Sequence, residues 1–254
     1  MQRYFLNENA ELNQRFFITN SEDIHHILNV MRMDVGDTII INFNHQRTYE
    51  SQLITIQKDC IEIETSRQIE LNAEMPVNVT ICSGLIKSDK YEWLLQKATE
   101  LGAHHFIATQ MDRSIVKLNA QKADKKVVRW QKIVKEAAEQ SYRQIVPKVE
   151  FISNFKTIYD MINQYDYVLM AYEESAKSGE RALLKNCIQN FAPDSKILLL
   201  FGPEGGFSQD EVAALHNKVK CVGLGPRILR AETSAIICFK RHKLSIRIKI
   251  DTMR

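Results

Sequence analysis

Residues 198–211, LLLFGPEGGFSQDE, combine three local signals that decide how this part of the chain folds. The apolar run ending at Phe201 is typical of a strand buried on both faces, and a glycine-rich turn follows it directly. Ser208 and Glu211 form a capping box, which predicts that a helix begins there. Such a turn lets a ligand approach bare backbone amides at the carboxyl end of a strand, and a tight turn without a ligand is the alternative. The stretch matches neither a P-loop nor the dinucleotide-binding G-x-G-x-x-G sequence.

A second glycine-proline turn lies in residues 224–235, LGPRILRAETSA, directly after a predicted strand at 220–224. It places Arg230, Glu232 and Thr233 where the chain turns into another helix. Two such turns, each following a late strand, can form the two walls of one pocket. The alternative for Arg230 and Glu232 is a surface ion pair without a function.

From residue 77 onward, predicted strands alternate with predicted helices, which indicates an α/β fold with a mainly parallel sheet covered on both faces. The predicted strands are 77–82, 106–110, 167–171, 196–201 and 220–224. Apolar residues at helical spacing predict helices over 91–101, ended by Gly102, and over 127–142.

The first 70 residues follow a different pattern, because apolar and polar residues alternate with a period of two at 38–43, 49–56 and 60–64. This alternation predicts a small antiparallel sheet or barrel. A short helix over 21–31, capped by Ser21, is expected before it. We place the domain boundary near 70–76, with a first domain at 1–72 and a second at 73–254.

The composition excludes several classes of protein. Hydrophobic residues make up 44% of the 254 residues and charged residues 26%, as in ordinary globular proteins. The apolar runs are too short to span a membrane, and the beginning of the chain lacks the apolar segment of a secretory signal, so we expect a cytoplasmic protein. Five cysteines without C-x-x-C spacing indicate reduced thiols, and neither they nor the histidines suggest a metal site.

Charge is distributed unevenly although the net value is only +3. Residues 1–76 carry a net charge of −6, whereas residues 113–148 carry ten basic and three acidic residues. The last fifteen residues, 240–254, carry six basic residues and one acidic residue. A basic stripe such as 113–148 can neutralise the phosphates of a nucleic acid, and a solvated helix face is the alternative.

The paired motifs GPEGGFSxxE at 202–211 and LGPRILRAET at 224–233 closely resemble those of the bacterial methyltransferases that modify N3 of uridine in small-subunit (16S) ribosomal RNA. These enzymes are members of the knotted SPOUT superfamily. Stretches at 30–37, 90–102 and 129–141 support the resemblance, which covers most of the chain.

The resemblance implies a PUA-like β-barrel that helps to hold RNA, followed by a SPOUT-type methyltransferase domain with a trefoil knot and a parallel sheet. It also implies a homodimer that acts on 16S ribosomal RNA or the assembled small subunit. The cofactor would be S-adenosylmethionine, held by Phe201, Gly202, Gly205, Gly206, Leu224, Gly225, Pro226, Ile228, Leu229 and Thr233.

Methyl transfer to N3 of uridine requires that the N3 proton leaves and that negative charge on the ring is stabilised. We expect Glu232 or Glu204 near the proton, and Arg230 or Arg113 orienting the base or its phosphate. The catalytic set is therefore Arg230, Glu232 and Glu204. RNA is expected to contact Arg32, Arg113, Lys117, Arg129, Lys132 and Arg143.

The end of the chain departs from the family. Residues 240–250, KRHKLSIRIKI, alternate isoleucine with basic residues and predict a strand where the family has an apolar helix. A changed reading frame near residue 239 would explain this. One alternative is therefore a ribosome-associated RNA-binding protein that has lost its activity because of the tail. A separate alternative is a related knotted enzyme that methylates a ribose hydroxyl instead of a base nitrogen.

Overall fold

The computed structural model describes residues 2–71, 73–174, 183–215 and 217–238. The chain forms two compact units. Unit 1 contains the residues up to Glu74 together with Ala138–Val146, and unit 2 contains Met75–Ala137 and the chain from Pro147 onward. The division predicted from the sequence, 1–72 and 73–254, does not include this return of the chain to unit 1. The tail 240–254 and the reading-frame hypothesis lie outside the described residues.

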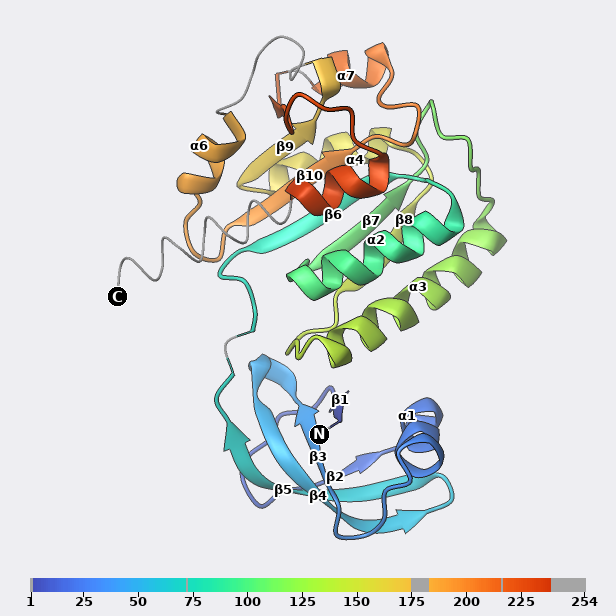
Figure 1. Cartoon of the computed structure of the whole chain (residues 1–254), viewed down its shortest axis with the longest axis vertical. Coiled ribbons are helices and arrows are strands. Elements are labelled where there is room, and N and C mark those ends of the chain that lie inside the picture. Colours follow the sequence, from blue (N-terminus) through green and yellow to red (C-terminus); the bar gives the residue numbers. More distant parts are fainter. Residues whose placement is uncertain (1, 72, 175–182, 216, 239–254) are drawn as a thin grey trace. The chain divides into compact units, whose positions relative to one another are not determined.

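Unit 1 is built on a curved five-stranded sheet (Figure 1). Its strands, in the order β1-β3-β4-β5-β2, are Arg3–Phe5, Thr38–Asn42, Thr48–Gln57, Cys60–Ile69 and Arg15–Ile18. Only β1 and β3 pair in parallel. Alternate residues such as Ile39, Ile41 and Ile61 are completely buried in one core, as the period of two predicts. The predicted small antiparallel sheet is confirmed except for the parallel pairing of β1 with β3.

The short helix of unit 1 differs from its prediction. α1 spans Ser21–His25 and continues as one π-helical turn, His26–Val30, so the helical stretch ends close to the predicted residue. The prediction that Ser21 caps this helix is wrong, because the N-cap residue is Asn20. The side chain of Asn20 accepts hydrogen bonds from the backbone N–H groups of Glu22 and Asp23, because an amide oxygen one residue earlier reaches both donors.

Unit 2 contains a six-stranded sheet in which every pairing is parallel. In the order β11-β9-β10-β6-β7-β8, its strands are Lys220–Val222, Tyr167–Ala171, Lys196–Phe201, Asn78–Gly84, His105–Thr109 and Lys148–Ile152. The bounds of β9 and β10 agree with the prediction. The edge strand β8 was not predicted.

Helices cover both faces of this sheet (Figure 1). α2 and the helical residues 231–238 lie in front of the strands in this view, and α4 lies behind them. α2 ends at Gly102, whose φ of 110° gives the left-handed cap predicted from the sequence. The helices of unit 2 are α2 (Ser88–Leu101), α3 (Ala120–Gln140, whose last residues pack in unit 1), α4 (Lys156–Met161), α6 (Leu183–Gln189) and α7 (Gln209–Leu215). Short 3-10 turns occupy Asn44–Gln46 in unit 1 and Ile162–Gln164 in unit 2.

The strand order of unit 2 determines where a ligand can bind. β10 lies between β9 and β6, which are distant from each other in sequence. In parallel sheets a crevice forms outside the carboxyl ends of strands at such a change of order. The loops after β9, β10 and β11 meet at this edge.

None of the helices in the described part of the chain is both long and apolar enough to cross a membrane.

Candidate functional site

A cavity of about 840 Å³ lies at the carboxyl edge of the unit 2 sheet. Three loops supply most of its wall: residues 171–174 after β9, 201–207 after β10, and 224–232 after β11. Lys90 of α2 and Arg113 of the loop after β7 also line it, together with Gln209, Val222 and Ser234. The two glycine turns singled out in the sequence therefore line one cavity.

The first glycine turn is fixed by close backbone packing. A Cβ atom on Gly202 would lie 2.8 Å from the carbonyl carbon of Gly206, so a larger residue would push the two ends of the turn apart. Gly206 has a φ of 70° and donates its N–H to the carbonyl of Pro203 over 2.9 Å. The turn therefore presents bare backbone to the cavity.

The predicted capping box is confirmed and also fixes a neighbouring loop. The Ser208 N–H donates to Glu211 Oε2 over 2.8 Å, and the Glu211 N–H donates to Ser208 Oγ over 3.2 Å. Glu211 Oε1 in addition accepts the Asp112 N–H, and Ser208 Oγ donates to the Asp112 carboxylate over 2.6 Å. This network holds the loop after β7, which carries Arg113, against the glycine turn.

Arg113 packs directly on the glycine turn. A Cβ atom on Gly205 would lie 2.9 Å from Cβ of Arg113, so the absence of a side chain lets the arginine approach. The Arg113 guanidinium donates to the Gly205 carbonyl over 3.2 Å while the residue stays exposed. Arg113 is thus held at the wall of the cavity with its charge facing solvent.

The second glycine turn is more open. Gly225 has a φ of 127°, and Ile228 is 78% exposed. Leu224 and Leu229 are partly buried and give this wall an apolar character. The Ser234 N–H donates to the Arg230 carbonyl over 2.8 Å, so the helix over 231–238 begins directly after Arg230.

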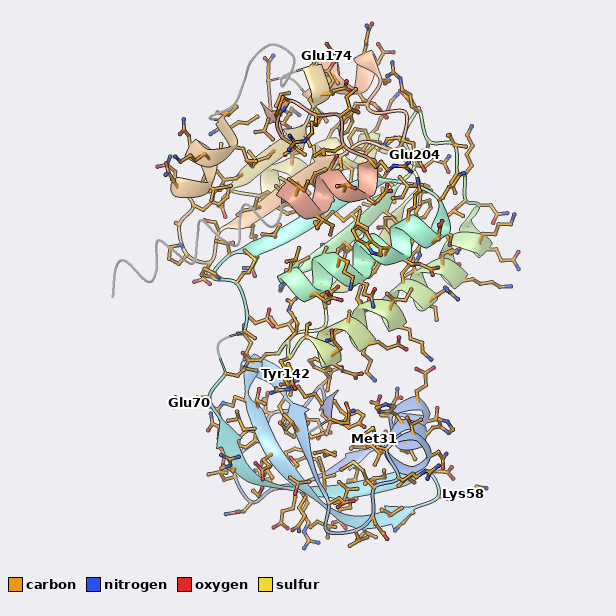
Figure 2. The ribbon with its side chains drawn as sticks, in the orientation of Figure 1. Met31, Lys58, Glu70, Tyr142, Glu174 and Glu204 are labelled. Carbon is orange, nitrogen blue, oxygen red and sulfur yellow. The ribbon has the colours of Figure 1, made fainter. Side chains whose placement is uncertain are left out.

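Two glutamates that line the cavity, Glu232 and Glu204, differ in their exposure and in their contacts. Glu232 Oε1 lies 3.7 Å from Lys90 Nζ, and Glu232 Oε2 is buried without a hydrogen-bond partner among the described residues. Glu204 is exposed and accepts a long hydrogen bond of 3.3 Å from the backbone N–H of Lys87. Figure 2 labels Glu204 and also Glu174, which lies three residues after the end of β9. Glu232 is therefore a partly buried carboxylate that faces a lysine, whereas Glu204 is exposed.

Most residues predicted for the cofactor and catalytic sets lie together. The cavity is lined by Phe201, Gly202, Glu204, Gly205, Gly206, Leu224, Gly225, Pro226, Ile228, Leu229, Arg230 and Glu232. Thr233 is not among the lining residues.

The residues predicted to bind RNA lie in several places. Arg113 lines the cavity, whereas Lys117, Arg129 and Lys132 are exposed elsewhere on unit 2 and Arg32 is exposed on unit 1.

Arg143 does not fit the RNA-binding set. Its side chain is only 2% exposed, and its Nη2 lies 2.6 Å from Glu74 Oε2 within unit 1. A buried guanidinium that is already bound to a carboxylate has no surface to offer a phosphate. We therefore leave Arg143 out of the proposed RNA contacts.

The sequence analysis missed two groups of residues in the cavity wall. The loop after β9 contributes Tyr172, Glu173 and Glu174, and α2 contributes Lys90. The loop could have been found, because the strand before it was predicted correctly and ligands bind at carboxyl ends. Lys90 begins the stretch 90–102 that supports the family resemblance, but nothing in the sequence places it at the cavity, which it reaches through the packing of α2.

Comparison with known proteins places the chain in a family. Residues 73–243 match the family model of an RNA methyltransferase domain, and residues 18–66 match that of the RNA methyltransferase PUA domain. The chain is 45% identical to ribosomal RNA small subunit methyltransferase E of Bacillus subtilis (strain 168), over 93% of each chain.

Two crystal structures share the whole architecture. A hypothetical protein with 39% identity superposes with a TM-score of 0.89, covering 98% of this chain and 100% of its own. Ribosomal RNA small subunit methyltransferase E from Neisseria gonorrhoeae, bound to S-adenosylmethionine, is 26% identical with a TM-score of 0.78, covering 96% and 97%. These likenesses confirm the predicted fold class, a PUA-like domain followed by a SPOUT-type domain with a parallel sheet. The chain belongs to the RNA methyltransferase family that includes ribosomal RNA small subunit methyltransferase E.

Proposed function

We propose that this protein transfers the methyl group of S-adenosylmethionine to N3 of a uridine in 16S ribosomal RNA. The observation that carries the proposal is the cavity lined by both glycine turns, in a chain 45% identical to the small-subunit enzyme of Bacillus subtilis. The proposal includes the homodimer implied by the resemblance and the cytoplasmic location expected from the composition.

The cavity suits the cofactor in size and in surface. Small-molecule sites typically enclose about 300–1,000 Å³, and the cavity measures about 840 Å³. The backbone of Gly202, Gly205 and Gly206 offers hydrogen-bonding groups on one wall, while Leu224, Ile228 and Leu229 offer apolar contacts on the other. The proposed binding set also includes Phe201, Gly225, Pro226 and Thr233. Bound S-adenosylmethionine supplies an electrophilic methyl group on a positively charged sulfur.

The chain itself must position the base and accept its proton. Glu232 is the better acceptor, because one of its oxygens is buried in the cavity wall without a hydrogen-bond partner among the described residues. Glu204 is exposed and therefore less suited to hold a base in place. Arg230 and Arg113 are both exposed at the cavity and can bind the base or a neighbouring phosphate.

RNA outside the reacting nucleotide is expected to contact exposed cations. Arg113, Lys117, Arg129 and Lys132 belong to the basic stripe of unit 2, and Arg32 lies on the PUA-like unit. Phosphate contacts of this kind supply affinity and register, and do not select the base.

The direct test is to incubate the purified protein with S-adenosylmethionine and small subunits that lack the modification, and to analyse the nucleosides by mass spectrometry. We expect 3-methyluridine to appear only when protein and cofactor are both present. A 2′-O-methylated nucleoside instead would assign the chain to ribose methylation. Cofactor binding without any methylated nucleoside would assign it to RNA binding alone.

A further inference from the structure

Lys90 and Glu232 form a charged pair inside the cavity wall. Lys90 lies in the first turn of α2, and Glu232 lies in the second residue of the helical stretch 231–238. Their Nζ and Oε1 atoms are 3.7 Å apart, and the side chains are 25% and 13% exposed. Both residues line the cavity.

Each member of the pair has hydrogen-bonding capacity for a ligand. Glu232 Oε2 is buried and has no partner in the described part of the chain, and an unsatisfied buried oxygen of this kind is uncommon. An ammonium group carries three N–H donors, and at 3.7 Å from Glu232 Oε1 the Lys90 ammonium lies beyond hydrogen-bonding distance of that oxygen. The pair thus presents a donor beside an acceptor.

This order of donor and acceptor is complementary to the pairing edge of uracil. Uracil presents the N3–H donor between the carbonyl oxygens O2 and O4, whereas cytosine presents an unprotonated N3 beside an amino group. A carboxylate facing the N3 atom of cytosine and an ammonium facing its amino group would leave polar groups unpaired, which discriminates strongly between ligands.

We propose that Lys90 and Glu232 together recognise the pairing edge of uracil: Glu232 Oε2 accepts the N3–H, and Lys90 Nζ donates to a neighbouring carbonyl oxygen. This inference rests on the proposed function, because it names the residues that select the base to be methylated.

The pair also provides an acceptor for the N3 proton of uracil and a cation for the negative charge that its loss leaves on the ring. The N3–H bond breaks as an O–H bond forms on Glu232, and the uracil ring becomes an anion whose charge lies partly on its carbonyl oxygens. Lys90 stabilises that charge. The N3 electron pair then forms the bond to the methyl carbon as the carbon–sulfur electron pair moves to sulfur. The proton leaves Glu232 to water after the product departs.

Three single variants and one double variant test the proposal, with 3-methyluridine formation as the readout. Lys90→Met should lower kcat/KM by about 100-fold or more, the usual effect of losing one charge-stabilising donor. Lys90→Arg should retain much of the activity. Glu232→Gln should lose about 10²- to 10⁴-fold, the contribution of a general base, and should recover steeply as pH rises because hydroxide then removes the N3 proton. Binding of S-adenosylmethionine, measured by calorimetry, should stay within about twofold in these three.

The matched control is the exchanged double variant Lys90→Glu with Glu232→Lys. It preserves an ion pair between the two helices but reverses the order of donor and acceptor, so we expect a normal thermal unfolding temperature and no recovery of activity. Recovery of activity in the exchanged variant, or Lys90→Met within about threefold of the wild type, would overturn the proposal. If the wild type itself forms no 3-methyluridine, the proposed function fails, whatever the variants do.

Discussion

Two arginine–glutamate pairs, one in each unit, have nearly the same geometry and very different surroundings. In unit 1, Arg143 Nε and Nη2 donate to Glu74 over 3.0 and 2.6 Å. In unit 2, Arg129 Nε and Nη2 donate to Glu92, both over 2.7 Å. The arginine side chains are 2% and 65% exposed, respectively. Burial, and not the length of the contact, therefore distinguishes the structural Arg143 from Arg129, which we propose as an RNA contact.

The buried pair holds the returning segment 138–146 in unit 1. Glu74 Oε1 also accepts the backbone N–H groups of Gln144 and Ile145, over 2.8 and 3.3 Å. The Arg143 carbonyl accepts a hydrogen bond from Asn42 of β3 over 3.1 Å. Figure 2 labels Tyr142 in the same segment, and its ring lies under the guanidinium of Arg3 at 4.3 Å. This segment is therefore fastened to the sheet at several points.

The largest effect is expected from Arg143→Met. The substitution leaves the carboxylate of Glu74 buried without its cation, and breaking a buried pair in this way typically costs about 3–5 kcal/mol of the free energy of unfolding. Urea unfolding followed by circular dichroism measures it. Arg129→Met is the matched control. Equal losses in both variants would show that burial does not distinguish the pairs.

Removing both members of the buried pair sharpens the comparison. Arg143→Met combined with Glu74→Leu eliminates the unpaired charge, and an apolar replacement of a buried pair is often neutral. Recovery should be partial, because the N–H groups of Gln144 and Ile145 lose their acceptor. The double variant should unfold at a urea concentration between those of Arg143→Met and the wild type. A double variant less stable than Arg143→Met would contradict this account.

The exposed pair should affect RNA binding more than stability. Arg129→Ala should cost less than about 1 kcal/mol of unfolding free energy, as exposed ion pairs do. Its affinity for RNA should fall, and the slope of log K against log salt should decrease by about one. Arg67→Ala is the control, because Arg67 is 71% exposed and paired with Glu50 in unit 1 but is not in the predicted RNA-binding set. Equal losses of RNA affinity in the two variants would remove Arg129 from that set.

The smallest effect concerns pH. The hydrogen bond from Arg129 holds the pKa of Glu92 below its ordinary value, against the opposing effect of burial. A lowered carboxyl pKa contributes stability that is present above the unfolded-state pKa and is lost as pH falls through the folded-state pKa. Arg129→Ala should therefore raise the pKa of Glu92 in an NMR titration. The difference in unfolding free energy between this variant and the wild type should shrink in acid. A difference that grows in acid would contradict the predicted effect of Arg129 on Glu92.

Local sequence signals predicted the parts of the fold that depend on nearby residues. The bounds of β9 and β10, the glycine cap of α2 and the capping box of Ser208 and Glu211 are of this kind. The two glycine turns were also recognisable, because each follows a buried strand directly. The sequence thus located the cavity through its backbone.

Features that depend on distant contacts were not predictable. Arg143 resembles its basic neighbours in sequence, and only its contact with Glu74, 69 residues earlier, shows that it is buried. Lys90 is one lysine on an amphipathic helix until the packing of α2 brings it to Glu232. The edge strand β8 follows a segment that packs in unit 1, which obscures the alternation of strands and helices.

The most direct test of the central claim compares the wild type with Gly202→Ala, using S-adenosylmethionine labelled in its methyl group and unmodified small subunits. The added Cβ would lie 2.8 Å from the backbone of Gly206 and distort the turn, so we predict labelled 3-methyluridine with the wild type and almost none with the variant. Thermal unfolding checks that the variant is folded, and RNA binding should be unchanged. Equal labelling by a folded variant, or label in any nucleoside other than 3-methyluridine, would contradict the account.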